Sequence, residues 1–295
     1  MAFELVYTSA PRGIKPGSSG FCTVAYTNGL AANTAVQLEA LSAYKAYFPP
    51  YDDHASQNPV AYSHYRVISS GEELHVLSRI CFNGLDYTKR SNKLAHHLVL
   101  RQHDLAQAPA GPAALFQQPG LFFCAWDREP LLFPRQKDIA ATDAGSGPAV
   151  TWEAYTGDAG WAGTLVERYL QAPDRPVYII FDPLQHHDVL SLLAEAALLL
   201  PPADRWQLTF NTYFTTLPAG ISCAWRFCVP NADALREARR SPGTLIIDLT
   251  QKMPAAPAGK WQSLARSAIA PPDPEAAVLP TPAGNDPADQ LRATA

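Results

Sequence analysis

The sequence lacks the motifs that mark the common classes of enzyme. It has no GxSxG of serine hydrolases, no HExxH of zinc proteases and no GxxxxGK[ST] phosphate-binding loop. Its 5 cysteines form no CxxC pair, which excludes zinc ribbons and redox motifs of that spacing. We therefore predict no catalytic residue, no metal and no cofactor, and we favour a protein that is not an enzyme.

The sequence also lacks a strong charge bias and a long apolar run. Its 23 lysines and arginines against 27 aspartates and glutamates give a net charge of −4, so we predict neither nucleic acid nor membrane as a partner. The most apolar run, residues 189–200, is too short to cross a bilayer, and the first seven residues do not resemble a signal peptide. The odd number of cysteines, each beside apolar residues, predicts buried free thiols and a cytoplasmic protein.

Apolar periodicity and turn signals divide the first 105 residues into five strands and one helix. The predicted elements are strands 3–8 and 21–27, a helix from 33 or 34 to about 47, strands 60–68 and 74–82 joined by residues 69–73, and a strand over 97–101. This ββαβββ order predicts an antiparallel α+β domain over residues 1–105, with its helix crossing the sheet. Longin-like and profilin-like folds have the same order, so we expect that topology.

Beyond residue 105 the pattern changes to alternating helices and strands. Residues 106–148 are predicted to be a linker or an excursion, with a strand over 121–126. The elements predicted in residues 149–250 are helices 161–171, 186–200 and 233–240 and strands 176–181, 206–213, 222–229 and 244–249. Because a β-α-β unit favours a parallel strand pair, we expect an α/β domain with a mixed sheet. Residues 251–295 are rich in alanine and proline and are predicted to be a disordered tail.

The most informative stretch is residues 86–100, DYTKRSNKLAHHLVL. It places Lys89, Arg90 and Asn92 on a short loop and His96 at the start of an apolar strand. Guanidinium groups bind carboxylates and phosphates, so we predict an exposed recognition loop for a partner or ligand. Adjacent histidines on a strand point to opposite faces, so His96 and His97 are not expected to share one site.

A second candidate lies in the first turn, residues 12–20, which is rich in glycine, serine and cations. Arg12, Lys15 and Ser19 give it the character of an anion site, and a flexible hairpin turn is the alternative. Together with His64 and the residues of the 86–100 stretch, they would line one cleft if the protein binds a small molecule.

A glycine-rich loop precedes the first helix of the second half. It contains Gly157, Asp158, Gly160, Trp161 and Gly163. Helix N-termini attract anions, but the spacing is not that of dinucleotide-binding loops. We therefore interpret it as a tight turn that allows close helix packing, with Trp161 as a core anchor. The histidine pair at 186–187 has no further metal ligand at suitable spacing, so no metal site is predicted there.

Five segments together resemble one protein family. They are residues 7–13, 15–25, 59–64, 86–97 and 157–163. They are similar to the second-type N-terminal domain of bacterial GTPase-associated proteins, and the resemblance covers about residues 3–250. It implies an accessory partner of a GTPase in a predicted multi-component defence or conflict system. It supplies no catalytic residues.

Two functional hypotheses follow. The first is a non-enzymatic adaptor or regulator that binds a GTPase or another protein of the same system. The alternative is a small-molecule or nucleotide sensor with a polar pocket and weak enzymatic activity at most. Convergence of the candidate side chains in one concave site would favour the second hypothesis. No oligomeric state is predicted.

Overall fold

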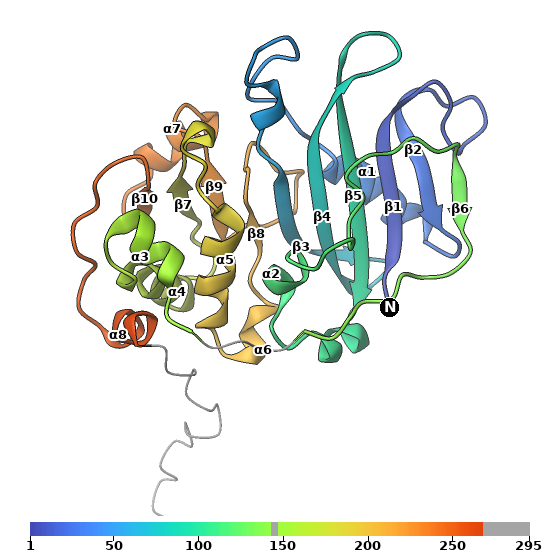
Figure 1. Cartoon of the computed structure of the whole chain (residues 1–295). Helices are drawn as coiled ribbons and strands as arrows, with labels where there is room; N and C mark the ends of the chain where they lie inside the picture. The colour runs from blue at the N-terminus through green and yellow to red at the C-terminus, as the bar shows by residue number, and fades with distance from the viewer. Residues whose placement is uncertain (143–146, 268–295) are drawn as a thin grey trace, which may run out of the picture.

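The protein is built around one large twisted sheet, which the computed structural model describes together with its helices for residues 1–142 and 147–267. Within these residues ten strands follow the order β10-β7-β9-β8-β3-β4-β5-β1-β2-β6 (Figure 1). Their bounds are β1 Phe3–Ala10, β2 Gly20–Thr27, β3 Ala61–Ser69, β4 Glu72–Leu85, β5 Ser91–Arg101, β6 Leu131–Phe133, β7 Val177–Ile180, β8 Phe210–Asn211, β9 Trp225–Cys228 and β10 Ile246–Asp248. The fold is therefore α+β with a mixed sheet.

The first half contains the predicted chain order β1-β2-α1-β3-β4-β5. Two details of the prediction are wrong. The β3–β4 hairpin turns through two residues, Ser70 and Gly71, both with positive φ, and strand pairing already includes Ser69 with Glu72. Strand β5 begins at Ser91, well before residue 97, because it pairs with β4 as far as Leu85. The likeness to longin-like folds stays a prediction.

Helix α1, Ala32–Leu41, covers one face of the antiparallel strands and is shorter than predicted. The side chain of Asn58 holds residues 47 and 48, at the end of the predicted helix, in a loop. Its Oδ1 accepts hydrogen bonds from the backbone N–H groups of Tyr47 (2.6 Å) and Phe48 (2.8 Å). Asn58 Nδ2 also donates to the carbonyl of Phe48 at 2.9 Å. Side-chain hydrogen bonds of this kind compete with the helix, so residues 42–60 form a loop clamped by Asn58.

The excursion after β5 packs on the opposite face of the sheet. It contains η2 (Gln102–Gln107), α2 (Pro112–Leu115) and β6, which pairs with β2 in parallel. The predicted strand over 121–126 is wrong, since these residues have no strand pairing. Instead Phe116 and Phe122 stack at 5.2 Å between ring centroids. Burial of these rings and of Leu115 makes the excursion part of the core.

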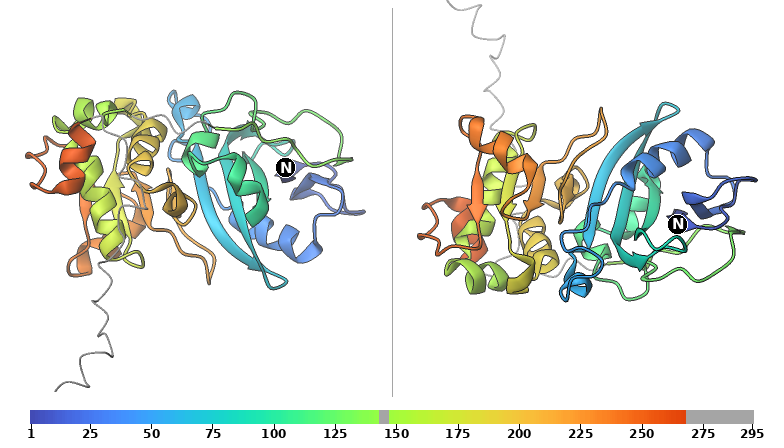
Figure 2. Two further views of the ribbon diagram at one scale, coloured as in Figure 1. Left: turned by 90° about the horizontal axis from the view of Figure 1, so that it is seen from below. Right: turned by 90° about the horizontal axis from the view of Figure 1, so that it is seen from above.

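The second half is a parallel α/β unit. Strands β10, β7, β9 and β8 are all parallel to one another, and the sheet becomes mixed where β8 pairs with β3 in antiparallel orientation. The helices are α3 Val150–Thr156, α4 Gly160–Gln171, α5 Val189–Leu198, α6 Pro202–Arg205 and α7 Asp233–Arg240. Helices α3, α4 and α5 lie on the face that carries α2, and α7 lies on the face that carries α1 (Figures 1 and 2). The two predicted domains thus share one sheet.

Several predicted elements in this half are shorter in the structure. The strands predicted over 206–213 and 222–229 reduce to β8 and β9. Helix α5 begins at Val189 because Asp188 caps it, accepting a hydrogen bond from the backbone N–H of Ser191 at 3.0 Å. His186 and His187 therefore precede the helix, beyond the 3-10 turn η3 (Pro183–Gln185).

The segment beyond β10 is ordered over part of the range for which disorder was predicted. Helix α8, Lys260–Arg266, packs against α4, and Gln262 and Ala265 are fully buried. The prediction is therefore wrong for α8, where one short helix buries the few apolar residues of a polar and proline-rich stretch. Residues 268–295 lie outside the described part of the chain.

Candidate functional site

One edge of the sheet carries most of the polar loops. It receives the C-terminal ends of β1 and β4 and the N-terminal ends of β2, β3 and β5. The parallel strands β7, β8 and β9 end at the same edge, because β8 runs antiparallel to β3. We call residues 11–19, 42–60, 86–90 and 181–188 the loop edge; it lies at the top of Figure 1.

Loop 86–90 is organised around the buried carboxylate of Asp86. Its Oδ1 accepts hydrogen bonds from the backbone N–H groups of Thr88 (2.8 Å) and Arg90 (3.0 Å) and from the Thr88 hydroxyl (2.6 Å). Its Oδ2 accepts from the hydroxyl of Ser9 at 2.8 Å. These bonds, led by that from the Thr88 hydroxyl, hold the pKa of Asp86 well below its usual range. An internal anion therefore fixes the backbone of the loop.

The cations of this loop face solvent. Lys89 adopts a left-handed φ of 64°, and the side chain of Arg90 is 69% exposed. Arg90 Nε donates to the Thr88 hydroxyl at 2.8 Å, which orients the guanidinium along the loop. The solvent-facing part of the 86–100 stretch is thus residues 87–91, in which Lys89 and Arg90 are the cations of a preformed turn.

Asn92 lies beneath the loop and has a structural role. Its Oδ1 accepts hydrogen bonds from the Thr8 hydroxyl (3.2 Å) and from the backbone N–H groups of Ser9 (3.1 Å) and Lys93 (2.8 Å). The amide therefore ties the first residues of β5 to β1. Its predicted place on a loop is wrong, because β5 begins one residue earlier.

His96 is fully buried on β5 and holds the excursion to the sheet. Its Nδ1 accepts a hydrogen bond from the backbone N–H of Phe123 at 3.0 Å, so its Nε2–H donates to Glu4 Oε1 at 3.1 Å. Lys137 Nζ lies 3.2 Å from the same carboxylate oxygen. Burial lowers the pKa of His96, so the ring is neutral and inaccessible to a partner.

His64 is also fully buried, near the seam of the two halves. Its Nδ1–H donates to the carbonyl of Leu208 at 2.6 Å, and its Nε2 accepts from His75 Nδ1–H at 3.0 Å. Both rings meet Trp206 edge-on, with centroids 5.5 and 5.3 Å away. Burial lowers the pKa of His64 to about 3, so this imidazole is a neutral core group.

The first turn places its predicted residues at the surface of the loop edge. Arg12 and Lys15 are more than half exposed and reach carboxylates, Glu129 at 2.7 Å and Glu39 at 3.9 Å respectively. Ser19 is exposed, at the end of the turn. Arg12 and Lys15 thus reach different elements, the excursion after β5 and helix α1, and do not gather into a shared cradle.

The eight predicted binding residues therefore do not converge in one cleft. Five are exposed on the loop edge and three are buried: Arg12, Lys15, Ser19, Lys89 and Arg90 against His64, Asn92 and His96. The sequence pattern could not separate the two groups, because both combine cations, amides and imidazoles with strand ends.

The glycine-rich loop is an internal joint. Gly157 ends α3 with a φ of 76°, and Asp158 Oδ1 accepts from the backbone N–H of Gly160 at 2.8 Å. Asp158 also receives two hydrogen bonds from Arg266, both 2.8 Å. A Cβ on Gly163 would lie 2.3 Å from the carbonyl oxygen of Trp261. The N-terminus of α4 thus holds a carboxylate of the chain itself, which leaves it unavailable to a bound anion.

Trp161 anchors the same joint. Its side chain is buried, and its Nε1–H donates to the carbonyl of Pro254 at 3.0 Å. The backbone N–H of Ala256 donates to Asp158 Oδ2 at 2.8 Å. Residues 254–266 are therefore held to α4 by hydrogen bonds at both of their ends.

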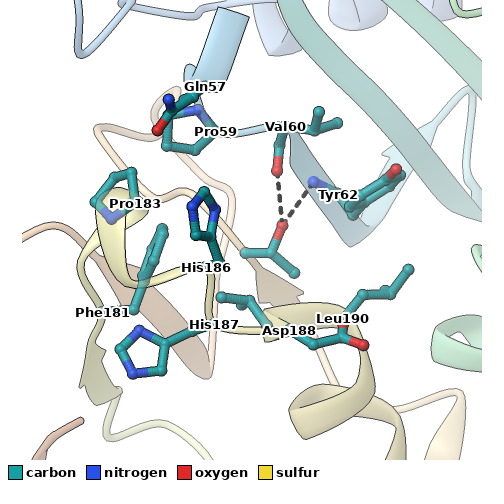
Figure 3. Close-up of a pocket in the computed structure, with 12 residues that line it drawn as sticks. Gln57, Pro59, Val60, Tyr62, Phe181, Pro183, His186, His187, Asp188 and Leu190 are labelled. Carbon is teal, nitrogen blue, oxygen red and sulfur yellow. Dashed lines mark hydrogen bonds between the residues drawn. The ribbon is translucent and has the colours of Figure 1, made fainter. Parts of the chain in front are cut away.

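A cavity of about 450 Å³ opens on the loop edge at the seam between β8 and β3. One wall comes from residues 57–62 and Thr212, the other from residues 181–190 after β7 (Figure 3). The Thr212 hydroxyl joins the halves, accepting from the Tyr62 N–H at 2.8 Å and donating to the Val60 carbonyl at 3.2 Å. The volume is that of a small-molecule or side-chain site.

Two histidines of the cavity wall formed by residues 181–190 have unusual conformations or environments. His186 adopts a left-handed φ of 53°, which is unfavourable for a residue other than glycine, and its ring points toward Pro59 (Figure 3). His187 packs edge-on against Tyr155, and its Nδ1 is buried without a hydrogen-bond partner in the described residues. Sequence analysis missed this cavity. The available signal was a polar run directly after a buried parallel strand, where open α/β sheets bind ligands.

Metal-ligating side chains and thiols were the remaining candidates for chemistry in the described residues. No three histidine, cysteine, aspartate or glutamate side chains among them are placed to hold a metal ion. Four cysteines are buried as predicted, and Cys124 is exposed. Burial raises the pKa of the Cys223 and Cys228 thiols to about 12, so neither is a ready nucleophile. In the described part of the chain, no helix has the length and apolarity of a membrane span.

Two family models match the chain on either side of the seam. Residues 1–136 match the N-terminal domain, type 2, of GTPase-associated protein 1. Residues 149–251 match the middle domain of GTPase-associated protein 1. No curated protein and no solved structure matches the chain.

Proposed function

Because the chain belongs to the GTPase-associated protein 1 family, we propose that it is a non-enzymatic adaptor or regulator that binds a GTPase. In this proposal the GTPase and the chain are components of one bacterial defence or conflict system in the cytoplasm. Both matched domains contribute to the loop edge, so a partner seated there would contact both of them at once.

The observation that carries this proposal is the preformed cationic loop 86–90. Asp86 fixes the backbone, and Lys89 and Arg90 extend into solvent from it. A rigid loop loses little conformational freedom on binding, and exposed cations steer an acidic partner surface into place. The buried residues of the same stretch act as its foundation.

Association with a GTPase from the same genome tests the proposal. The purified protein should retain that GTPase, loaded with GDP or with a GTP analogue, in a pull-down and in a titration by interferometry. The double variant Lys89→Ser, Arg90→Ala should weaken binding about tenfold, which corresponds to about 1.4 kcal/mol for two exposed charges. Lys252→Ala, an exposed cation far along the chain, is the matched control. No association in either nucleotide state would overturn the proposal.

One observation favours a second function, the sensing of a small molecule. The seam cavity has the volume of a ligand site and a strained histidine on its wall. A ligand there would contact both halves and stabilise the folded chain. A thermal-shift screen with nucleotides should raise the melting temperature, and His186→Gly should reduce that rise while relieving the unfavourable φ. Absence of any shift across the screen counts against this function.

A further inference from the structure

A second hollow on the loop edge, which we call the lysine groove, is distinct from the seam cavity. It has a volume of about 530 Å³ and lies between residues 44–50 and the first residues of β2 and β5. The side chains that matter for its chemistry are Phe21, Tyr44, Lys45, Tyr47, Asn92 and Lys93. Its lining contains two lysines and no carboxylate.

Lys93 is a cation without a counter-ion in the described residues. Its Nζ lies 5.1 Å from the ring centroid of Phe21 and 5.6 Å from that of Tyr7, and no carboxylate of the described chain pairs with it. Burial lowers the pKa of this ammonium, which means that the charge is partly removed from water. A half-buried ammonium over aromatic rings is stabilised further by an anion that completes its shell.

Asn92 adds a neutral donor beside this cation. Its Oδ1 is occupied by three hydrogen bonds, from Thr8, Ser9 and the Lys93 N–H. Its Nδ2 donates to no partner in the described residues, and the residue lines the groove. Lys93 Nζ and Asn92 Nδ2 therefore offer two donors side by side, which suit the oxygens of a carboxylate.

The walls of the groove offer apolar surface. Phe21 is 44% exposed and Tyr47 is 37% exposed, although large aromatic side chains are normally buried. The hydroxyl of Tyr44 is occupied, since it donates to the carbonyl of Pro59 at 2.7 Å. A smaller hollow shares Lys45, Ala46 and Tyr47 and continues toward the start of α7, where the carboxylate of Asp233 is paired with Arg236 at 2.9 Å. The groove thus has room for an extended segment rather than a single ion.

We propose that the lysine groove binds an extended acidic segment of a protein partner. A carboxylate of that segment contacts Lys93 Nζ and Asn92 Nδ2, a second one approaches Lys45, and an apolar neighbour packs on Phe21 and Tyr47. Charge complementarity carries this assignment, because both charged lining residues are cations. Naming the GTPase as the owner of the segment rests on the proposed function, whereas the chemistry of the groove does not.

The first experiment tests the groove without any GTPase. A fluorescent random copolymer of glutamate and tyrosine is titrated into the full chain, and a copolymer of lysine and tyrosine serves as the control ligand. The acidic copolymer should bind with a marked salt dependence, and Lys93→Met should weaken it about tenfold, the loss of one charge-assisted hydrogen bond. Lys45→Met, at an exposed position, should give a smaller loss and keeps the test valid if Lys93→Met fails to fold. Lys252→Met, at an exposed position outside the groove, should leave this affinity unchanged.

Three results would overturn the inference. The first is that the two copolymers bind equally well. The second is that Lys93→Met and Lys45→Met both bind the acidic copolymer as tightly as the parent protein does. The third is that oligothymidylate binds more tightly than the acidic copolymer, which would indicate a nucleic-acid groove instead. The pull-down separates the two proposals. If the GTPase binds but is indifferent to Lys93→Met, and the copolymer does not bind, the groove inference fails alone. If the copolymer binds and the GTPase does not, the proposed function fails alone.

Discussion

Two polar motifs of this chain are each built on an aspartate with a lowered pKa, yet they do opposite things. Asp86 accepts its hydrogen bonds from its own loop and from Ser9, and the loop then presents Lys89 and Arg90 to solvent. Asp158 accepts from Arg266 and Ala256, which lie about a hundred residues away, and so closes its motif against another segment. The comparison teaches that a carboxylate with a lowered pKa identifies an organised loop but not whether that loop is available to a partner.

Lowering the pH should reduce the free energy of unfolding through the buried histidines before it protonates either aspartate. Burial lowers the pKa of His64 and His97 to about 3, from an ordinary value near 6.5. As the pH falls below 6.5 the unfolded chain takes up these protons first, so the free energy of unfolding falls until about pH 3. Each histidine should contribute a loss of about 1.4 kcal/mol per pH unit in that window.

Urea unfolding at pH 7, 6 and 5 measures this slope. The two aspartates, with pKa values lowered from 3.8, contribute only below about pH 4. His97→Asn should reduce the slope of the free energy of unfolding against pH, because it removes one buried titrating ring. His97 lies buried between the hydroxyls of Ser42 (2.8 Å) and Ser78 (2.7 Å). A stability that is flat between pH 7 and 5 would contradict the neutral, buried state of these rings.

A substitution that fills the space between α4 and α8, beside the Asp158 motif, should have the next largest effect on the free energy of unfolding. Gly163→Ala places a Cβ 2.3 Å from a backbone oxygen of Trp261, which forces α8 away from α4. We expect a loss of about 2 kcal/mol in the free energy of unfolding and early proteolysis within residues 254–266. Gln171→Ala, at the exposed C-terminal end of α4, fills no such space and is the control. A wild-type cleavage pattern for Gly163→Ala would show that α8 does not need this contact.

Removing the long-range ion pair of the second motif should have a smaller effect. Arg266→Gln abolishes the charge that faces Asp158, and the pair is partly exposed, with side-chain exposures of 38% and 14%. Solvent screening limits the expected loss to about 1 kcal/mol, which urea unfolding can resolve. High salt should reduce the difference between variant and parent. An equal loss at low and high salt would mean that packing rather than charge holds this joint.

The most local effect, confined to one loop, is expected for the aspartate of the first motif. Asp86→Asn keeps the shape of the side chain but removes the anion that orders loop 86–90. Amide hydrogen exchange at Thr88 and Arg90 should accelerate about tenfold, while exchange in the middle of β5 stays unchanged. Unchanged exchange at these two amides would show that strand pairing alone orders the loop.

Local sequence pattern was sufficient to predict most of the helices and strands. The alternation along β1 to β4 and the helical spacing of α4 and α7 depend on neighbours in sequence, which is why these elements were predictable. The loop conformation of residues 47 and 48 was not, because Asn58 holds it from the other end of the loop. The early start of β5 was missed for the same reason, since its first residues gain strand character only from pairing with β4.

What the sequence determined by itself is the element order, the family and the position of an unusual polar stretch, because each of these is written in contiguous residues. Tertiary structure alone decided which of those polar groups a partner can reach. His64 and His96 are buried by other strands and by the excursion after β5, while Lys89, Arg90 and Lys93 remain accessible. Tertiary structure also created the seam cavity, where residues more than a hundred positions apart face one another. Burial and convergence are properties of distant pairs of residues, and no local pattern contains them.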